Sequence, residues 1–248
     1  MIMRTVIMMT CCLLALSLSV LGAAAPLYVR LLPQDCQELY RSGVNRSGVY
    51  TIYPSDTTPV EVYCEVGCSE DSARGWTVIQ RRIDGSVNFY RHWQEYRNGF
   101  GNKSGEYWLG LENLYMMTHN KLYELKVDME DYDGSKASAV YTVFSVGSES
   151  NGGYMLQVGG FIDKGAGDSL SYHSGVGFST YDKEQNSYGC AKQYLGGFWY
   201  NACHITNPNG IYLGRRDGTY FAIGNVWATW RGYDYGLKSI TMKIRPAS

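Results

Sequence analysis

The chain has 248 residues and a formal net charge of -1; aromatic residues make up 14% of it and charged residues 18%. A disordered chain would be poor in aromatic residues and far from charge balance, so this composition indicates a globular protein. The near-neutral charge provides no long-range attraction to nucleic acid, and we expect no nucleic-acid partner.

The first 24 residues have the three parts of a secretory signal peptide. Arg4 precedes an apolar run at residues 6–21, and small residues follow it. This pattern predicts cleavage after Ala24, a short N-terminal segment at residues 25–34 and one domain at residues 35–248. The apolar run is shorter than the roughly 20 residues of a membrane-spanning helix, so we expect no membrane span; a retained anchor is the alternative.

Cleavage would remove Cys11 and Cys12 and leave five cysteines in an oxidising compartment, where thiols pair. These are Cys36, Cys64, Cys68, Cys190 and Cys203. Because five is odd, one thiol is left for a partner chain, and we expect it to be Cys68. The spacing of Cys64 and Cys68 leaves zinc as an alternative, although no Cys-x2-Cys pair or nearby histidine completes a zinc set.

Two glycosylation sequons begin at Asn45 and Asn102, in polar stretches rich in turn residues. A secreted chain passes the enzymes that glycosylate such triplets, so both asparagines are candidate glycan sites. Sequons also occur by chance, and an unmodified surface is the alternative at each.

Spacing and alternation then predict the secondary structure. Helical spacing occurs at residues 35–41, 88–98 and 110–118, and strand-like alternation at residues 48–53, 60–63, 76–82, 122–130, 138–146 and 238–245. The connections are too short and too rich in glycine for regular βαβ crossovers, which predicts an α+β fold with antiparallel strands. From residue 152 to the last strand, we expect long ordered loops held by buried Trp199, Trp227 and Trp230.

Three separated motifs carry a family resemblance: Gly-Trp-Thr-Val-Ile-Gln-Arg-Arg at residues 75–82, Gly-Glu-Tyr-Trp-Leu-Gly-Leu at 105–111, and Phe-Trp-Tyr-x2-Cys-His at 198–204. With these motifs the chain resembles a fibrinogen-related domain from about Cys36 to its C-terminus. The resemblance implies a fibrinogen C-terminal-like domain with a central antiparallel sheet, short helices and a loop-rich C-terminal binding subdomain. It also implies two disulfides, Cys36 with Cys64 and Cys190 with Cys203. The Arg-Gly-Asp tripeptide by which a family member binds integrins is absent, so integrin binding is not carried over.

In this family, a pocket beside the second disulfide binds acetyl groups on sugars or amines. The residues at the matching positions are Tyr194, Cys203, His204, Phe221, Ala222 and Tyr233. Aromatic and alanine walls suit a methyl group, while a backbone N–H and an imidazole can hydrogen-bond the acetyl carbonyl. The resemblance further implies a cis peptide bond between Cys203 and His204. The alternative is that these aromatic side chains only pack the loops.

A calcium site is also expected from the resemblance, at Asp182, Glu184 and Asn186. Their side-chain oxygens occupy alternate positions in a turn, and calcium binds oxygen ligands. The family usually has aspartate at the second and third positions, so the longer glutamate and the neutral amide should weaken binding. The alternative is a solvated polar loop.

Catalysis has little support in the sequence. We find no Gly-x-Ser-x-Gly and no His-Glu-x-x-His motif. His92, His119 and His173 are isolated histidines; His173, near Asp168, is more readily a structural residue in a turn. The acidic run at residues 130–133 has the residue types of a glycosidase but is typical of a strand end followed by a turn. We therefore expect no enzyme.

The sequence thus predicts a secreted extracellular-matrix glycoprotein that recognises acetylated carbohydrate or matrix ligands without chemistry, assisted by calcium. We expect a homo-oligomer, because several linked pockets bind more tightly than one. The alternative is a structural protein of elastic microfibrils that binds fibrillin, elastin or collagen without using the acetyl pocket. Roles in host defence, with innate immunity, and in matrix assembly, with cell adhesion, both remain open.

Overall fold

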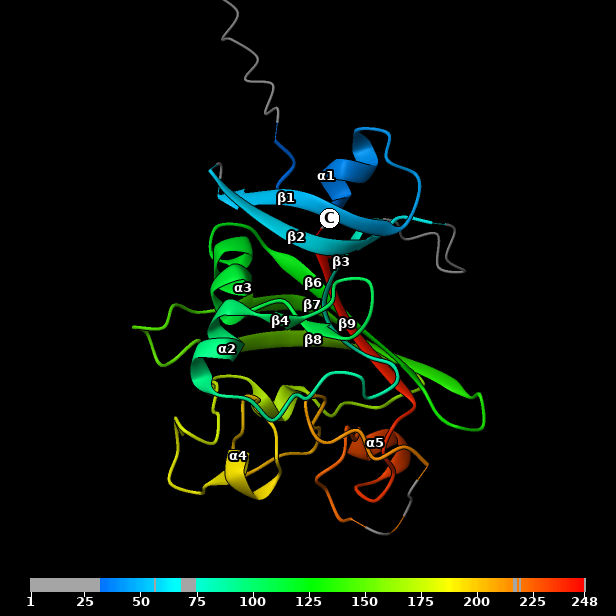
Figure 1. Cartoon of the computed structure of the whole chain (residues 1–248), viewed down its shortest axis with the longest axis vertical. Helices are drawn as coiled ribbons and strands as arrows, with labels where there is room; N and C mark the ends of the chain where they lie inside the picture. Colours follow the sequence, from blue (N-terminus) through cyan, green and yellow to red (C-terminus); the bar gives the residue numbers. More distant parts are fainter. Residues whose placement is uncertain (1–31, 56, 68–74, 216–217, 219, 248) are drawn as a thin grey trace, which may run out of the picture. The chain divides into compact units, whose positions relative to one another are not determined.

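The structure, a computed structural model, describes residues 32–55, 57–67, 75–215, 218 and 220–247. The predicted signal peptide, Cys11, Cys12 and Cys68 lie outside these residues. The part of the chain from Leu32 onward forms one compact unit, which Figure 1 shows in colours that follow the sequence.

Within the described residues, the strands form one sheet of nine strands, and its neighbouring strands pair antiparallel. They are β1 (Gly48–Ser55), β2 (Thr58–Glu65), β3 (Trp76–Arg82), β4 (Phe100–Gly101), β5 (Tyr107–Trp108), β6 (Tyr123–Glu130), β7 (Lys136–Val146), β8 (Leu156–Lys164) and β9 (Ser239–Pro246). The main path runs β1-β2-β3-β9-β6-β7-β8, and the β4–β5 hairpin pairs with β3. The last strand therefore lies in the middle of the sheet, between β3 and β6 (Figure 1).

The helices are short and lie between these strands. They are α1 (Cys36–Arg41), α2 (Trp93–Asn98), α3 (Leu111–Thr118), the 3-10 helix η1 (Ser171–His173), α4 (Cys190–Gln193) and α5 (Ala228–Arg231). α3 packs against β7 and β1, and α2 packs against α3. Among the described residues, no helix combines the length and the apolar character that crossing a membrane requires. The α+β class and the antiparallel sheet predicted from the sequence are confirmed.

Helix α1 is fixed at its N-terminus to the hairpin beside it. The side chain of Asp35 caps the helix by accepting hydrogen bonds from the backbone N–H groups of Gln37 and Glu38, at 2.9 and 3.0 Å. Cys36, the first helical residue, forms a disulfide with Cys64 in β2. The cap satisfies N–H groups that have no partner within the helix, and the disulfide joins the helix to the sheet.

One predicted helix is shorter in the structure, and one long strand was not predicted. The helix expected at residues 88–98 begins only at Trp93, because the side chain of Asn88 accepts a hydrogen bond from the N–H of Tyr90 and closes a turn. β8 lies in a stretch for which loops were expected. Gly159 and Gly160 interrupt its alternation, and a Cβ atom at Gly160 would lie only 1.9 Å from the hydroxyl oxygen of Thr142.

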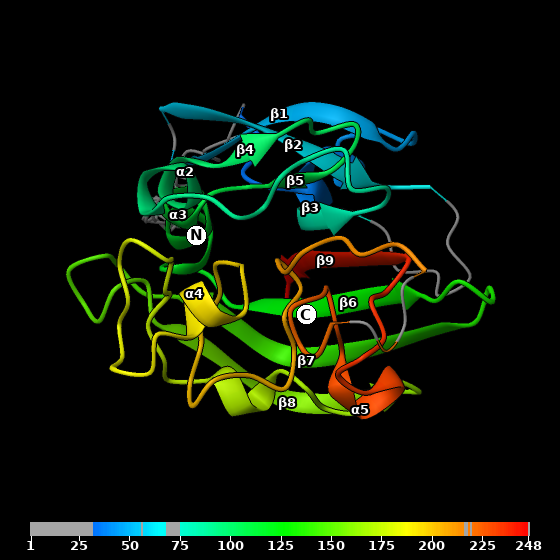
Figure 2. The same cartoon turned by 60° about the horizontal axis from the view of Figure 1, so that its bottom comes forward.

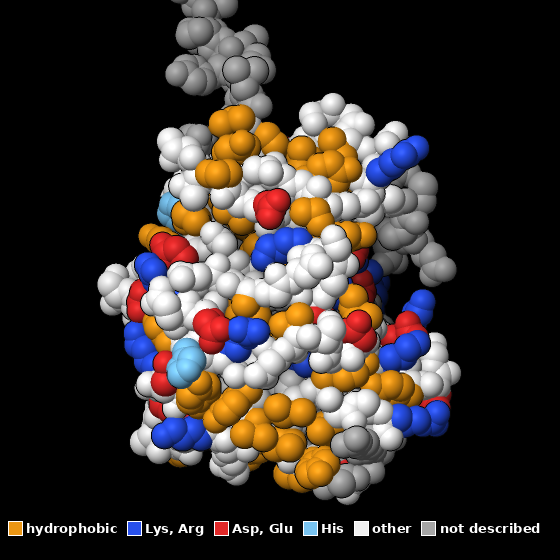
Figure 3. All heavy atoms as spheres, in the orientation of Figure 1, with side chains coloured by type: hydrophobic (Ala, Val, Ile, Leu, Met, Phe, Trp, Pro, Cys, Tyr) orange, Lys and Arg blue, Asp and Glu red, His pale blue; other side chains and the backbone are white. Residues whose placement is uncertain are grey.

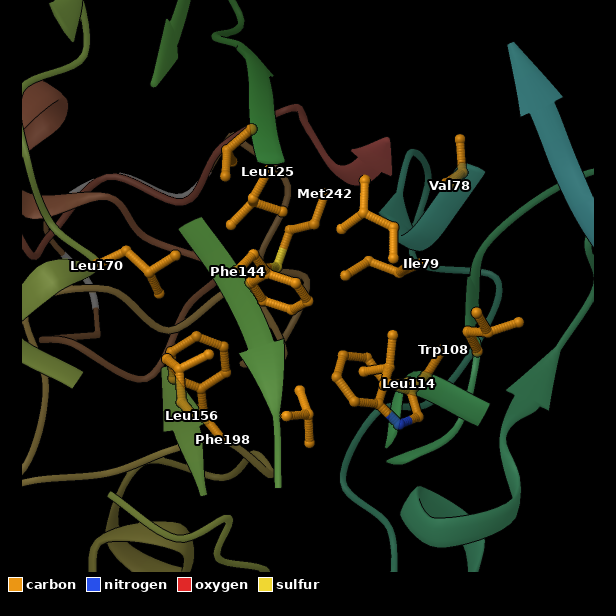
Figure 4. Close-up of a cluster of buried hydrophobic side chains, with 14 of the residues drawn as sticks. Val78, Ile79, Trp108, Leu114, Leu125, Phe144, Leu156, Leu170, Phe198 and Met242 are labelled. Carbon is orange, nitrogen blue, oxygen red and sulfur yellow. The ribbon is translucent and has the colours of Figure 1, made fainter. Parts of the chain in front are cut away.

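The core lies on the sheet face that the helices cover. Figure 4 shows Met242 of β9, Leu125 of β6 and Phe144 of β7 close together in it. Between β8 and β9 the described residues form long loops, in which the helices are η1, α4 and α5 (Figure 2). Trp199 and Trp227 are buried among them as predicted, whereas Trp230 is half-buried. The predicted binding subdomain is therefore built from loops on a packed sheet.

Candidate functional site

The site predicted beside the second disulfide is held by two loop segments. Cys190, the first residue of α4, forms a disulfide with Cys203, and their Cα atoms are 5.5 Å apart. Tyr194 follows α4 as its C-cap residue. The peptide bond between Ala202 and Cys203 is cis. The expected cis bond between Cys203 and His204 is wrong by one residue.

Aromatic rings surround His204. The ring of Tyr194 meets the imidazole edge to face, with the ring centroids 4.4 Å apart. The ring centroids of Tyr200 and Tyr233 lie 5.9 and 6.0 Å from the centroid of the imidazole. The hydroxyl group of Tyr233 also donates a hydrogen bond to the backbone carbonyl of His204, at 3.4 Å. These contacts bring together residues from three separate stretches of the sequence.

His204 is neutral near pH 7. The residue is only 8% exposed, and this burial lowers the pKa of its imidazole to about 4. The nearby His173 acts in the same direction, whereas the backbone of Ala222 opposes the shift. Within the described residues, neither ring nitrogen of His204 has a partner with hydrogen-bond geometry.

The backbone beside this imidazole also presents unused donors. Among the described residues, no acceptor is found for the N–H groups of Cys203 and His204. An unpaired buried polar group costs roughly 1 to 3 kcal/mol, so such groups seldom gather without a partner. The arrangement can therefore hydrogen-bond an oxygen atom that lies between the imidazole and these N–H groups.

The opposite side of the site is apolar. The N–H of Ala222 donates to the carbonyl of Tyr233 at 3.0 Å, which joins the two segments, and Ala222 has a positive φ of 65°. The ring of Phe221 lies 5.5 Å from that of Tyr233 and is 65% exposed. Hydrophobic side chains gather over this end of the molecule in Figure 3, around α4 and α5. The six residues expected from the resemblance are thus brought together, with an apolar rim beside unpaired polar groups.

The sequence alone did not indicate two further members of this region. Tyr200 is buried beside His204, and Tyr172 exchanges hydrogen bonds with Ala202, donating to its carbonyl at 3.2 Å and accepting from its N–H at 3.3 Å. Tyr172 is 30 residues from Ala202 in sequence, so only the fold places them together. Tyr200 stands within the Phe-Trp-Tyr motif, which was the one signal for it.

The predicted calcium residues are engaged by protein groups. One carboxylate oxygen of Asp182 accepts from the N–H of Trp93 at 2.9 Å and from the hydroxyl of Thr180 at 2.7 Å. The side-chain N–H₂ group of Asn186 donates to two backbone carbonyls, and its oxygen accepts from the N–H of Tyr188.

Glu184 completes the predicted set. One of its oxygens accepts from the N–H of Ala191 at 2.8 Å, and the other is buried and has no partner among the described residues. Calcium requires several oxygen atoms directed at one point, and two of the three side chains are directed at protein donors and acceptors instead. The described geometry does not fit a calcium site, so we derive no step of recognition through calcium.

The residues considered for zinc binding and for catalysis have other roles in the structure. Cys64 is in a disulfide and has no thiolate for zinc, and Cys68 lies outside the described residues. His173 is buried, with Nδ1 2.6 Å from the carbonyl oxygen of Trp199 and Nε2 accepting from the N–H of Ile205. Burial lowers its pKa to about 4. His173 is therefore a structural residue, as the sequence favoured.

The acidic run at residues 130–133 is a strand end and turn, as expected. β6 ends at Glu130, whose carboxylate pairs with Lys238. Asp131 is buried, pairs with Arg231, and accepts backbone hydrogen bonds within the turn. The third carboxylate, of Asp133, pairs with Arg215 at 2.9 Å. All three carboxylates of the run are thus engaged by protein groups, and none is left free for the acid and base pair of a glycosidase.

The family was established by comparison with known proteins. The model of the C-terminal globular domain of fibrinogen beta and gamma chains matches residues 32–247. The chain belongs to this family. The resemblance read from the motifs is therefore confirmed, and with it the fold class.

The similar proteins agree with this assignment. Microfibril-associated glycoprotein 4 of Bos taurus is 47% identical over 223 residues, which cover 87% of this chain and 86% of the relative; that of Homo sapiens is 47% identical over 222 residues. The fibrinogen-like globe domain of human ANGPTL6 has a TM-score of 0.81 at 43% identity, covering 87% of this chain and 96% of that structure. A lamprey fibrin D-dimer solved with the peptide ligand Gly-His-Arg-Pro-amide has a TM-score of 0.80 at 35% identity, covering 87% and 74%. These relatives support a secreted, matrix-type recognition module.

Proposed function

We propose that the chain is a secreted, non-catalytic recognition module that binds acetyl groups of carbohydrate or matrix ligands beside the Cys190–Cys203 disulfide. The observation that carries this proposal is the set of unpaired polar groups at one place: both ring nitrogens of His204 and the N–H groups of Cys203 and His204. A carbonyl oxygen that accepts from the one N–H of the neutral imidazole and from these backbone N–H groups would give them a partner that the described residues do not supply.

The rest of the site suits the other parts of an acetyl group. The methyl group would pack against Ala222 and the rings of Tyr194 and Tyr233, which are apolar surfaces near the imidazole. His204 is neutral at physiological pH because its pKa is about 4, so it offers one N–H donor without a buried charge. The six site residues include no carboxylate, and a neutral acetyl group therefore fits better than an amine.

The groups around His204 support binding without a catalysed reaction. The histidine nearest to this site, His173, has its ring nitrogens occupied by backbone groups. Nucleophilic catalysis requires a base that is hydrogen-bonded to a serine, threonine or cysteine nucleophile, and the cysteine beside His204 is in a disulfide. Membership of a family of recognition modules points the same way.

A second candidate function rests on the exposed aromatic side chains. Tyr188, Tyr220 and Phe221 are 62%, 44% and 65% exposed, and the similar glycoproteins are named for their association with microfibrils. Exposed aromatic surface of this kind often marks a protein-binding face. Fibrillin, elastin or collagen would then bind this face, and the acetyl site would be incidental.

The decisive experiment measures binding of the purified mature protein to immobilised N-acetylglucosamine, with calcium and with a chelator. Tyr194→Ala and Phe221→Ala remove site walls, and Tyr188→Ala is the matched control because it removes an exposed aromatic ring outside the six residues. We expect both site variants to lose binding at least tenfold and the control to keep it. We expect the chelator to leave binding unchanged, because the described geometry does not fit a calcium site. No binding by the unaltered protein would contradict the proposal.

The two candidates separate in a competition experiment. Excess N-acetylglucosamine should displace elastin or fibrillin if these ligands use the acetyl site. Binding of matrix proteins that is indifferent to the sugar favours the structural alternative.

A further inference from the structure

An open groove lies between the β1–β2 hairpin and the loop that joins β4 to β5. Its volume is about 800 Å³. One wall contains Val49, Pro59 and Glu61 from the hairpin, and the other contains Asn102 and Lys103 from the loop. Asn102 is the first residue of a predicted sequon and is separated by 53 residues (102 - 49) from Val49 across the groove.

The fold fixes the position of Asn102. Its backbone N–H donates to the carbonyl of Glu106, and its carbonyl accepts from the N–H of Gly105, each at 2.9 Å, which closes the hairpin loop. Its side-chain oxygen accepts from the N–H of Ser104 at 2.9 Å. Arg81 holds the same loop from below by donating to the carbonyls of Lys103 and Gly105. Asn102 is exposed, and its side-chain nitrogen has no hydrogen-bond partner among the described residues.

The lining of the groove has the chemistry of a sugar-binding surface. Val49 is 39% exposed and Pro59 is exposed, so the hairpin offers apolar patches for the C–H faces of a pyranose ring. Glu61, Lys103 and the asparagine side chains supply donors and acceptors for hydroxyl groups. A glycan attached to Asn102 would begin at the edge of the groove, so its first sugars could occupy the groove without a separate ligand.

The groove also borders an edge of the sheet. β1 is the outermost strand on this side, and beyond β2 its backbone has two hydrogen bonds among the described residues: the N–H of Tyr53 donates to the carbonyl of Pro33, and the side chain of Gln34 donates to the carbonyl of Pro54. Exposed edge strands can pair with other chains, and proteins commonly cover or charge them. A bulky hydrophilic group over Val49 and Pro59 would hinder such pairing.

We propose that Asn102 carries an N-linked glycan whose first sugars lie in this groove against Val49 and Pro59 and cover the β1–β2 hairpin. In its formation, a bond forms between Nδ2 of Asn102 and C1 of the first sugar, while the bond from C1 to the diphosphate of a lipid-linked oligosaccharide donor breaks and the amide loses one proton. The donor belongs to the secretory pathway, so the inference shares with the proposed function only the secretion of the chain.

The other sequon provides a matched control. Asn45 is exposed in the connection between α1 and β1 and does not line the groove. Because Asn45 is not among the lining residues, a glycan there would begin outside the groove. Asn45→Gln therefore removes a glycan site without changing the contents of the groove.

The test compares the secreted full chain with its Ser104→Ala and Asn45→Gln variants, made in cells that attach oligomannose glycans. Ser104→Ala removes the sequon but keeps Asn102 and its turn. Mass spectrometry determines occupancy at Asn102, and hydrogen exchange is measured for peptides that contain residues 48–60. We expect exchange there to become roughly threefold faster or more in Ser104→Ala and to stay unchanged in Asn45→Gln, because only the first variant uncovers the hairpin.

Trimming with endoglycosidase H, which leaves one N-acetylglucosamine on the asparagine, should keep most of the protection, since the first sugar is the one proposed to lie in the groove. A secreted chain that is unmodified at Asn102 overturns this inference alone, as does a modified chain whose exchange at residues 48–60 does not respond to Ser104→Ala. A chain that never enters the secretory pathway contradicts both this inference and the proposed function.

Discussion

His204 and His173 show how one residue type serves two purposes in the same loop region. Both are buried and both have a pKa near 4, because burial disfavours the charged imidazolium. Backbone groups occupy the ring nitrogens of His173, which fixes the loop, whereas those of His204 have no partner among the described residues. The difference in hydrogen bonding, and not in pKa, marks His204 as the residue that is available to a ligand.

These lowered pKa values predict a pH dependence of stability. Free histidine has a pKa of about 6.5, so between pH 6.5 and pH 4 the unfolded chain binds more protons than the folded one. The free energy of unfolding is therefore full above about pH 6.5 and falls as the pH decreases. By pH 5 the expected loss is about 2 kcal/mol for each buried histidine, since 6.5 - 5 is 1.5 units at about 1.36 kcal/mol per unit.

Urea unfolding at pH 7.5 and pH 5 measures this loss. His204→Phe keeps an aromatic ring and removes one titrating group, so about half of the loss should remain. His92→Gln is the control, because His92 is exposed. Equal losses in the His204→Phe variant and the unaltered protein would contradict the assignment of this pH range to the buried histidines.

At the scale of elements, the two disulfides have different tasks. The Cys36–Cys64 bond spans 28 residues and joins α1 to β2, while the Cys190–Cys203 bond spans 13 residues and joins the two segments of the candidate site. In the chain-entropy model, closing loops of these lengths stabilises a fold by about 3 to 4 kcal/mol each. The two bonds should therefore contribute similar amounts to the free energy of unfolding, although only the Cys190–Cys203 bond lies in the candidate site.

We predict that removing either disulfide lowers stability by a similar amount, but that only removal of the Cys190–Cys203 bond abolishes binding. Replacing both Cys190 and Cys203 by alanine should lower the free energy of unfolding by about 3 kcal/mol and abolish binding to N-acetylglucosamine, because His204 then loses its covalent anchor. The matched change, alanine at Cys36 and Cys64, should cost a similar amount and leave binding within about twofold at a temperature where the protein stays folded. Chemical denaturation and binding to the immobilised sugar are the measurements. Retained binding without Cys190 and Cys203 would show that the bond does not position the site.

Sequence reasoning succeeded where a pattern reflects local physics. Alternation located β6, β7 and β9 to within about two residues, because each buries mainly one face, and β3 was also located although it is buried along its whole length. It failed at β8, an edge strand in which Gly159 and Gly160 interrupt the alternation and in which Thr142 of the neighbouring strand leaves no room for a Cβ atom at Gly160. The six site residues followed from family resemblance, and no spacing rule indicated Tyr172, since its contact with Ala202 depends on how two distant loops fold together.

At the scale of the whole molecule, the chain separates support from recognition. The sheet and its helices bury most of the large apolar side chains, and the loops between β8 and β9 carry the candidate site. An acetyl group offers few contacts, so one such site binds weakly by itself. Linking several copies can raise the affinity 10² to 10⁴-fold without any new contact, which makes the oligomeric state central to the proposed function.

The cysteines predict how the copies are linked. Four of the five cysteines that would remain after the predicted cleavage pair within the chain, and the fifth, Cys68, lies outside the described residues. We expect the secreted protein to run as a disulfide-linked species on a non-reducing gel and as a monomer after reduction. Cys68→Ser should run as a monomer in both and bind an N-acetylglucosamine surface at least about a hundredfold more weakly, while its affinity for the soluble monosaccharide stays unchanged. Because only avidity is removed, a parallel loss of monosaccharide binding would indicate damage to the site instead. A native protein that is monomeric without reductant, with Cys68 open to alkylation, would exclude the linkage through this thiol.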